Sequence, residues 1–335
     1  MEAKIDTQTD ELERLQPPRV HDAHGEIRKI GVEIEMLNLT IEHAAGVVLG
    51  LFGGQATRET EYQIRIADSS LGGFGVELDS SPLKAIAKKR KRYRVLGLWD
   101  NMRERFFGAV AEHVTPIEIV TAPLSPAQLP EVDRLVQALG REGAIGTDAS
   151  LVYGFGVHLN PSVPSTDPLV LRDYIRAYVL LQPWLTYVLR PNMSRRVMRY
   201  IAPYPKSYAR VVLHPRYAPT TAQLIDDYLK HNPTRNRGLD LLPLLAHIDE
   251  QRVKRAIDDD RVSARPTFHF RMPDSRVDDP SFRITDSWRA WLEVERLACD
   301  AARLAELCRA GLRLQSPFAL LRPRYYALPR PRPSP

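Results

Sequence analysis

Cysteine is scarce in this chain, where Cys299 and Cys308 are the only two among 335 residues. They lie nine positions apart in one stretch that we expect to be helical, a poor spacing for pairing on a single helix. The sequence therefore indicates neither a disulfide framework nor a zinc-binding scaffold, and a reducing compartment is expected.

Long apolar runs are also missing. No run approaches the ~20 residues that a membrane-spanning helix needs. The first twenty residues, MEAKIDTQTDELERLQPPRV, are polar and acidic and lack the apolar core of a signal peptide. We therefore expect a cytoplasmic protein without a membrane partner.

The common glycine-rich nucleotide motifs are absent. The sequence contains neither a GxxxxGK[ST] phosphate loop nor a GxGxxG fingerprint. These absences exclude the best-known phosphate-loop and dinucleotide-binding routes, so any nucleotide must be bound in another way.

Negative charge is in the minority, with 41 acidic against 47 basic residues and a formal net charge of +6. Much of the excess lies in segment 84–94 and near the C-terminus. Segment 84–94 is interpreted as a solvated helix or loop, or as a contact for an acidic substrate or nucleotide phosphates. Nucleic acid is not expected as a partner, because aromatic interleaving and a known motif are lacking.

The two ends of the chain have the composition of flexible segments. Residues 1–28 are interpreted as a flexible arm, and residues 316–335 as an extended tail rich in Pro and Arg. The catalytic domain is expected to span residues 29–315, with 190–260 as a helical insertion or lid.

Polar pairs stand out in what remains. Four segments place two polar, chemically capable side chains two residues apart within an apolar run. Because strand side chains alternate, each pair projects from one face of its strand while the apolar neighbours pack on the other. The pairs are Glu33 and Glu35, Glu77 and Asp79, His158 and Asn160, and His269 and Arg271; Glu118 lies alone in a fifth such segment. Such a face is typical of a metal–phosphate active site.

Each candidate also has a purely structural interpretation. Two neighbouring carboxylates, Glu33 and Glu35, need a cation when partly buried, and Mg²⁺ suits them, but a surface strand with salt bridges is the alternative. Asp79 is either a ligand or the cap of the turn over residues 79–82. His158 is either a core histidine or, beside Asn160 on a Gly-rich strand, a ligand.

A second cationic cluster falls in region 190–219, which has few regular signals. Arg195, Arg196 and Arg199 occur there with several tyrosines. The cluster is interpreted either as a mobile substrate-binding loop or as an ordinary surface loop.

Periodicity and turn residues predict the following elements. Strands are expected at 29–39, 55–59, 61–68, 73–79, 116–121, 149–159 and 266–272. Helices are expected from about 40 to 51, over 99–113, 126–140 and 167–189, two or three times within 220–260, and from about 285 to 310.

Five of these segments, in this order, resemble the motifs of the amidoligase family, which belongs to the carboxylate–amine ligases with the glutamine synthetase fold. They are GVEIE, the acidic strand SSLGGFGVELD with the turn that follows it, EIVTAPLS, GFGVHLNPS and FHFRMP, within residues 29–275. The resemblance implies an α+β fold with a curved, mostly antiparallel sheet and helices on one face.

The resemblance also implies a function. It suggests an ATP-dependent ligase that uses Mg²⁺ (or Mn²⁺) to join a small amino-acid-like or peptide carboxylate to an amine through an acyl phosphate. A glutamine amidotransferase partner supplying ammonia is also suggested. The implied metal ligands are Glu33, Glu35, Glu77, Asp79, Glu118 and His158. The implied catalytic residues are Arg271, Glu35 and His158, and the implied nucleotide-binding residues are Arg271, Asn160, His269 and Arg199.

Two positions depart from the pattern of the more familiar ligases. Those enzymes carry His-x-His on the histidine strand and Glu-x-Arg on the arginine strand, whereas this chain has a single His158 there and His269 in the Glu place. His269 can still bind a metal as neutral imidazole. The rival interpretations are a carboxylate or guanidino phosphotransferase on the same fold, and a non-catalytic ATP- or partner-binding protein that has lost a metal site.

Overall fold

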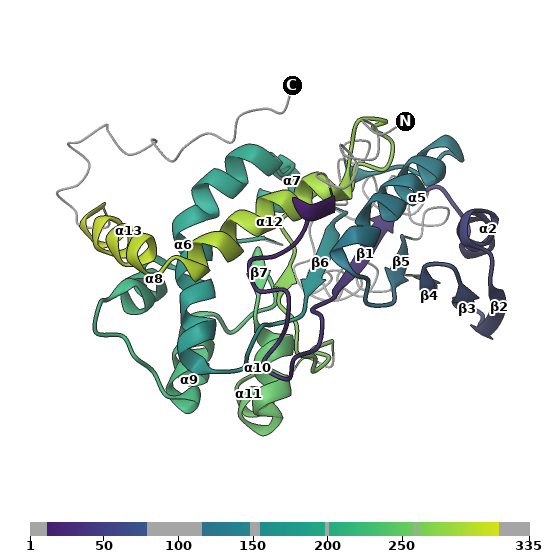
Figure 1. The fold of residues 1–335 in the computed structure, drawn as a ribbon. Coiled ribbons are helices and arrows are strands. Elements are labelled where there is room, and N and C mark those ends of the chain that lie inside the picture. Colours follow the sequence, from purple (N-terminus) through teal and green to yellow (C-terminus); the bar gives the residue numbers. More distant parts are fainter. Residues whose placement is uncertain are drawn as a thin grey trace, which may run out of the picture.

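The computed structural model describes residues 12–78, 116–147, 155–197, 201–257, 259 and 261–314. Within these residues eight strands form one antiparallel sheet that does not close into a barrel, in the order β2-β3-β4-β5-β1-β6-β8-β7 (Figure 1). The predicted α+β fold with a curved antiparallel sheet is therefore confirmed.

The strands are β1 (Ile30–Met36), β2 (Gln55–Thr60), β3 (Gln63–Ser69), β4 (Gly72–Leu78), β5 (Ile117–Thr121), β6 (Val157–Pro161), β7 (Leu239–Asp240) and β8 (His269–Phe270). The helices are α2 (Ile41–Phe52), a 3-10 turn η1 (Pro126–Gln128), α5 (Leu129–Arg141), α6 (Pro168–Leu189), α7 (Met193–Val197), α8 (Lys206–Leu213), α9 (Thr221–His231), α10 (Leu242–Ile248), α11 (Glu250–Ala256), α12 (Ile284–Cys299) and α13 (Ala301–Leu314).

Strand β1 lies inside the sheet, between β5 and β6. Its Val32, Ile34 and Met36 are fully buried, whereas the residues between them are only partly buried. This alternation follows from the two-residue period of a strand and gives the sheet one apolar and one polar face.

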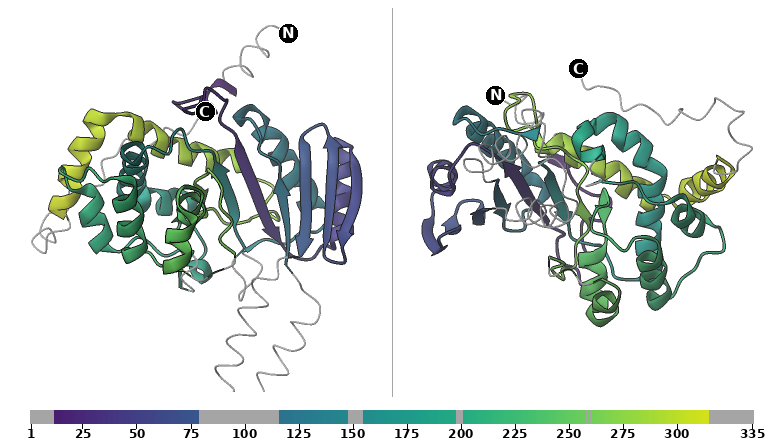
Figure 2. Two further views of the ribbon diagram at one scale, coloured as in Figure 1. Left: turned by 90° about the horizontal axis from the view of Figure 1, so that it is seen from below. Right: turned by 180° about the vertical axis from the view of Figure 1, so that it is seen from behind.

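Helices cover the apolar face (Figures 1 and 2). Helix α2 packs on β3 and β4, while α5 contacts α2 and α12, and α12 also lies along α6. Trp291 of α12 packs against Phe268 and Phe270, with ring centroids 5.4 and 5.2 Å apart. These large aromatic rings fix the position of β8 on the core.

The remaining helices gather beside the β6–β8–β7 end of the sheet (Figure 2). Helix α6 contacts α8, α9 and α13 there, and α8 also contacts α9 and α13. Tyr178, Tyr204, Tyr208 and Tyr228 pack edge to face between them. Segment 190–260 supplies helices α7 to α11 and also β7, which pairs with β8. Its action as a lid stays a prediction.

Some predicted boundaries were wrong. The strand expected over 266–272 is reduced to His269–Phe270, with single bridges at Thr267 and Asp274 on either side. Pro266 and Pro273 lack an N–H group and cannot donate to a continuous ladder there. The helix expected over about 285–310 is broken at Asp300, whose carboxylate accepts from the Arg303 amide and so starts a second helix.

The region expected to be irregular, 190–219, contains the short helices α7 and α8. The expected helix 99–113 and segment 84–94 lie outside the described residues, as does part of the expected strand 149–159. Among the described helices, none is both long and apolar enough to cross a membrane.

Candidate active site

Carboxylates form a row across three neighbouring strands on the polar face. Glu35 of β1 pairs with Glu118 of β5, and Glu118 pairs with Glu77 of β4. Because directly opposed residues of antiparallel strands share a face, the three side chains project from the same side of the sheet. Like charges placed in this way repel each other, and a cation bound among them would relieve the repulsion.

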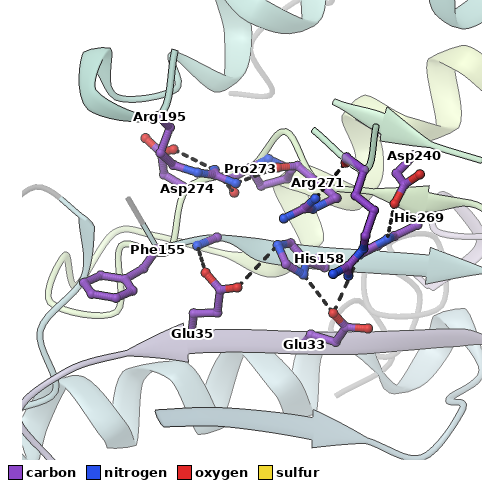
Figure 3. A network of polar contacts seen from close by, with 12 residues as sticks. Glu33, Glu35, Phe155, His158, Arg195, Asp240, His269, Arg271, Pro273 and Asp274 are labelled. Carbon is purple, nitrogen blue, oxygen red and sulfur yellow. Dashed lines mark hydrogen bonds and ion pairs between the residues drawn. The ribbon is translucent and has the colours of Figure 1, made fainter. Parts of the chain in front are cut away.

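Imidazole and amide groups continue the face on the other side of β1. Glu33 pairs with His158 of β6, and the Glu33 Oε2 to His158 Nδ1 distance is 2.8 Å (Figure 3). The Asn160 amide donates to Glu33 Oε1 at 2.8 Å. Arg265 Nη2 donates to the same oxygen and to Asn160 Oδ1, each at 3.1 Å. Glu33 is thus held in one orientation from three directions.

His269 completes this side from β8. Its Nε2 lies 3.7 Å from Glu33 Oε2, and its Nδ1 lies 3.4 Å from Oδ2 of Asp240 on β7. The His269 and His158 rings meet edge to face with centroids 5.0 Å apart. His269 and Asp240 are almost completely buried. A buried acid and imidazole therefore stand next to Glu33.

Gly156 controls access to the other nitrogen of His158. The Gly156 amide donates to Glu35 Oε2 at 2.6 Å, and His158 Nε2 lies 3.7 Å from Glu35 Oε1 (Figure 3). A Cβ at position 156 would come within 2.8 Å of His158 Nε2 and 2.7 Å of the Arg195 guanidinium. Only glycine therefore leaves this nitrogen accessible without a steric clash.

Burial and hydrogen bonding shift the pKa values of Glu33 and His158. Burial raises the pKa of Glu33, but contacts with His158 and His269 outweigh it and hold that pKa well below its usual range. Burial lowers the pKa of His158 to about 3, against the opposing effect of its hydrogen bond with Glu33. At neutral pH the site thus contains a Glu33 carboxylate and a neutral His158 ring, which are the forms that bind metals.

Two overlapping groups of side chains have the composition of a metal site. Ligand atoms of Glu33, His158 and His269 lie within 4.8 Å of one another, and so do those of Glu35, Glu118 and His158. Among the described residues, His158 Nε2 and both His269 nitrogens are buried without a hydrogen-bond partner. Buried polar atoms are normally satisfied, so these nitrogens fit a bound cation.

Arginines face the same region. Arg271 Nη1 donates to the Arg235 carbonyl at 2.8 Å, and Arg271 lies close enough to His158 to contribute to lowering its pKa. Burial, and then the charge of Arg271, lowers the pKa of Arg235. Within the described part of the chain, the Nε atoms of Arg235, Arg265 and Arg271 are buried and lack a hydrogen-bond partner. Such a group of guanidinium ions suits a phosphate or carboxylate.

Arg195 supports the segment that carries His269 and Arg271. Its guanidinium donates to the carbonyls of Arg271 and Pro273 at 2.7 and 2.6 Å and to Asp274 Oδ1 at 2.9 Å (Figure 3). Arg195 is only 1% exposed. The interpretation of this arginine as part of a surface or substrate-binding loop was therefore wrong, because α7 directs it into the interior.

The structure brings together most of the residues singled out in the sequence. Those on the shared polar face are Glu33, Glu35, Glu77, Glu118, His158, Asn160, His269 and Arg271. Asp79 and Arg199 lie outside the described residues. Sequence reasoning missed Asp240, Arg265 and Arg235. The only available signal was Asp240 within the apolar run GLDLLPLL, which marks a buried acid.

Comparison with known families agrees with this geometry. A family model described as "Putative amidoligase enzyme" matches residues 26–293, which include every strand of the sheet. The chain belongs to this family. No curated protein and no solved structure matches the chain. The resemblance read from the five motifs is confirmed. Membership supports an enzyme of the ligase type, which in general acts on a carboxylate and an amine.

Proposed function

We propose that this amidoligase is an ATP- and Mg²⁺-dependent carboxylate–amine ligase. It would join a small amino-acid-like or peptide carboxylate to an amine through an acyl phosphate. The observation that carries the proposal is the polar face itself. Carboxylates of β4, β5 and β1 adjoin the imidazoles of β6 and β8, with three arginines whose buried Nε atoms have no described hydrogen-bond partner.

The carboxylate row is suited to magnesium. Glu35, Glu118 and Glu77 offer hard oxygen ligands, and magnesium in phosphate-transfer sites is bound through one or two carboxylates together with substrate phosphates. Asp79, which lies outside the described residues, stays a predicted further ligand. When bound, the cation neutralises the phosphate charge that would otherwise repel an incoming nucleophile.

The arginines are suited to the transferred group. Arg271 is assigned to the γ-phosphoryl group, and Arg235 and Arg265 to neighbouring oxygens of the nucleotide or the substrate carboxylate. Asn160 and His269 border this position from β6 and β8. Arg199 stays a predicted nucleotide contact. Fixed guanidinium groups stabilise a phosphoryl transition state through charge and geometry.

The proposed chemistry has two steps. A substrate carboxylate oxygen attacks the γ-phosphorus, the bond from that phosphorus to the bridging oxygen breaks, and ADP leaves. The amine nitrogen then attacks the acyl carbon, the carbon–oxygen bond to phosphate breaks, and phosphate leaves while the nitrogen loses a proton. Glu35 and His158, 3.7 Å apart, lie beside the reacting groups in this scheme. A glutamine amidotransferase as source of the amine stays a prediction.

Product formation with and without an amine tests the proposal. The purified chain is incubated with Mg²⁺ and ATP, with pooled carboxylates, and with or without pooled amines, and ADP release is measured. We expect ADP only when both pools are present. Glu35→Gln should reduce the rate about a hundredfold or more, since it removes a charge that acts on the transition state.

Glu293→Gln is the matched control. Glu293 is an exposed carboxylate on α12 that pairs with Arg296, and its loss should leave the rate unchanged. ADP release with carboxylates alone would instead establish a phosphotransferase. ATP binding without turnover, with the same affinity in Glu35→Gln, would overturn the proposal in favour of a binding protein.

A further inference from the structure

One buried arginine directs its side chain at a single short segment of main chain. Arg195 of α7 lies beside the segment that runs from Arg271 to Asp274 (Figure 3). Its guanidinium donates to the first three carbonyls of this segment, those of Arg271, Met272 and Pro273, at 2.7, 3.3 and 2.6 Å. The Asp274 carboxylate accepts a further hydrogen bond at 2.9 Å. A planar group with five N–H donors can hold consecutive acceptors in one geometry, so Arg195 fixes the path of this segment.

The charge of Arg195 is balanced within the same arrangement. The side chains of Arg195 and Asp274 are both almost fully buried. The Asn192 amide, just before α7, donates to Asp274 Oδ2 at 2.6 Å. A lysine at position 195 would keep the positive charge beside Asp274, but its single nitrogen could not hold three carbonyls in a fixed plane. The three carbonyls therefore require the shape of the guanidinium as well as its charge.

Arg195 also lies against the start of β6. A Cβ at Gly156 would come within 2.7 Å of Arg195 Nη2. The Pro273 carbonyl that accepts from Arg195 also accepts from the Val157 amide at 3.1 Å. The guanidinium is thus packed between β6 and the segment that it holds. A change at Arg195 would therefore move the main chain from which the Arg271 side chain extends.

We propose that Arg195 is a positioning residue for Arg271. By holding the Arg271 carbonyl and the two carbonyls that follow, it fixes the direction in which the Arg271 side chain reaches the γ-phosphoryl group. Arg195 acts through Arg271 and does not itself bind the nucleotide. The inference rests on the proposed function, in which Arg271 serves that group. It makes the preference for ATP over ADP depend on a residue of α7.

Nucleotide affinity without carboxylate or amine substrates tests this. The dissociation constants of ATP and ADP for the full chain are measured by calorimetry in the presence of Mg²⁺. We expect the wild type to bind ATP at least about tenfold more tightly than ADP, because charge-assisted hydrogen bonds from Arg271 act on the γ-phosphoryl group. Arg271→Ala should abolish this preference.

Variants at position 195 separate positioning from general support of the fold. Arg195→Met should remove most of the preference for ATP while changing the affinity for ADP by less than about threefold, since a displaced Arg271 loses only the terminal phosphate. Arg195→Lys keeps the charge beside Asp274 and should recover part of the preference. Arg195→Met combined with Arg271→Ala should be no worse than Arg271→Ala alone, because the two residues act through one contact.

Arg196→Met is the matched control. Arg196 is the next residue of α7, is exposed and donates to Met193 Sδ at 3.8 Å, so its loss should leave both affinities unchanged. An unchanged preference for ATP in Arg195→Met, or an equal weakening of ATP and ADP binding, would overturn the positioning role. A further loss of ATP affinity in the double variant would overturn it as well.

The outcomes separate this inference from the ligase proposal. A wild type that binds ATP no better than ADP would overturn the role given to Arg271 and this inference with it. Loss of the preference in Arg195→Met, with no amide formed by the wild type, would support the positioning role and overturn the ligase. If Arg195→Met does not fold, Arg195→Lys decides, and a preference for ATP equal to that of the wild type would then overturn the inference.

Discussion

Two buried polar clusters in this molecule look alike but differ in one respect. In the first, Arg28 and Glu295 form a doubly hydrogen-bonded ion pair at 2.7 Å, with Trp291 and Tyr174 donating to the same carboxylate. Arg28 also donates to main-chain carbonyls. In the second, around Glu33, the imidazole nitrogens of His269 have no described hydrogen-bond partner.

The difference shows how a structural network can be told from a functional one. Burial is similar, since the side chains of Arg28 and Glu295 are 2% and 0% exposed and those of His269 and Asp240 are 2% and 0% exposed. Glu295 and Glu33 both have a hydrogen-bond donor for each carboxylate oxygen. The difference lies in the imidazoles beside Glu33, because His158 Nε2 and the His269 nitrogens are buried without a described hydrogen-bond partner, and buried polar atoms are normally satisfied by a ligand or water.

The largest expected effect on stability comes from breaking the Arg28–Glu295 ion pair. Glu295→Gln leaves Arg28 buried without its counter-charge, so the free energy of unfolding should fall by about 3–5 kcal/mol, with or without metal. Chemical denaturation measures it. Glu293→Gln, on the exposed side of the same helix, should change it by less than about 0.5 kcal/mol. Equal values for the two variants would remove the distinction between the clusters.

The next largest expected effect on stability concerns the cluster around Glu33 and depends on bound metal. A cation at about a hundred times its dissociation constant should stabilise the wild type by about 2.7 kcal/mol. Glu33→Gln should lose most of that gain, and it should also lower the stability of the metal-free protein, because the pKa of Glu33 is held well below its usual range in the folded state and Arg265 loses its counter-charge. Melting temperatures with and without Zn²⁺ or Mn²⁺ measure this. An equal loss of stability with and without metal would show that Glu33 is only structural.

The smallest effect concerns a third buried carboxylate. Asp133 accepts from the Ile284 and Thr285 amides and the Thr285 hydroxyl at the start of α12. Burial raises its pKa above the ordinary value of 3.8, against those hydrogen bonds. The folded state therefore binds the proton more tightly, and stability from this group is present at low pH and lost as pH rises from 3.8 through the raised value.

Asp133→Asn removes that titration. The stability of the wild type relative to the variant should therefore decline with rising pH across this window and stay constant above it. At neutral pH the variant should differ from the wild type by about 1 kcal/mol, the usual value of a hydrogen bond. Denaturation curves at a series of pH values measure this. A relative stability that rises with pH instead would contradict the assigned direction.

Much of the prediction of the site rested on the two-residue period of side chains along a strand. It placed Glu33 with Glu35 and His158 with Asn160 on shared faces, because that geometry is local. The assembly across strands is not local. Glu33 contacts His158, which follows it by 125 positions, and Arg265, which follows it by 232 positions. Nothing within β1 encodes the register of such pairs.

Residues whose role depends on tertiary position were the ones missed. Asp240 lies in an apolar run of the sequence, and only the pairing of β7 with β8 places it beside His269. In the sequence, Arg195 comes shortly after a proline and has the pattern of a surface arginine. In the fold, α7 directs its side chain into the interior. In both cases the decisive information is the packing of one element on another, which amino-acid pattern alone does not supply.

The central place of β1 has a consequence for synthesis of the chain. Its carboxylates emerge early, but Arg271 is made 238 residues after Glu33. At ribosomal rates of about 5–20 residues per second, roughly 10–50 s separate them. The two strands that flank β1, namely β5 and β6, are made earlier within this interval, but the arginine that faces β1 is made only at its end. A nascent chain that ends before β6 thus contains the acidic side chains of β1 without the imidazole and guanidinium groups that face them in the folded protein.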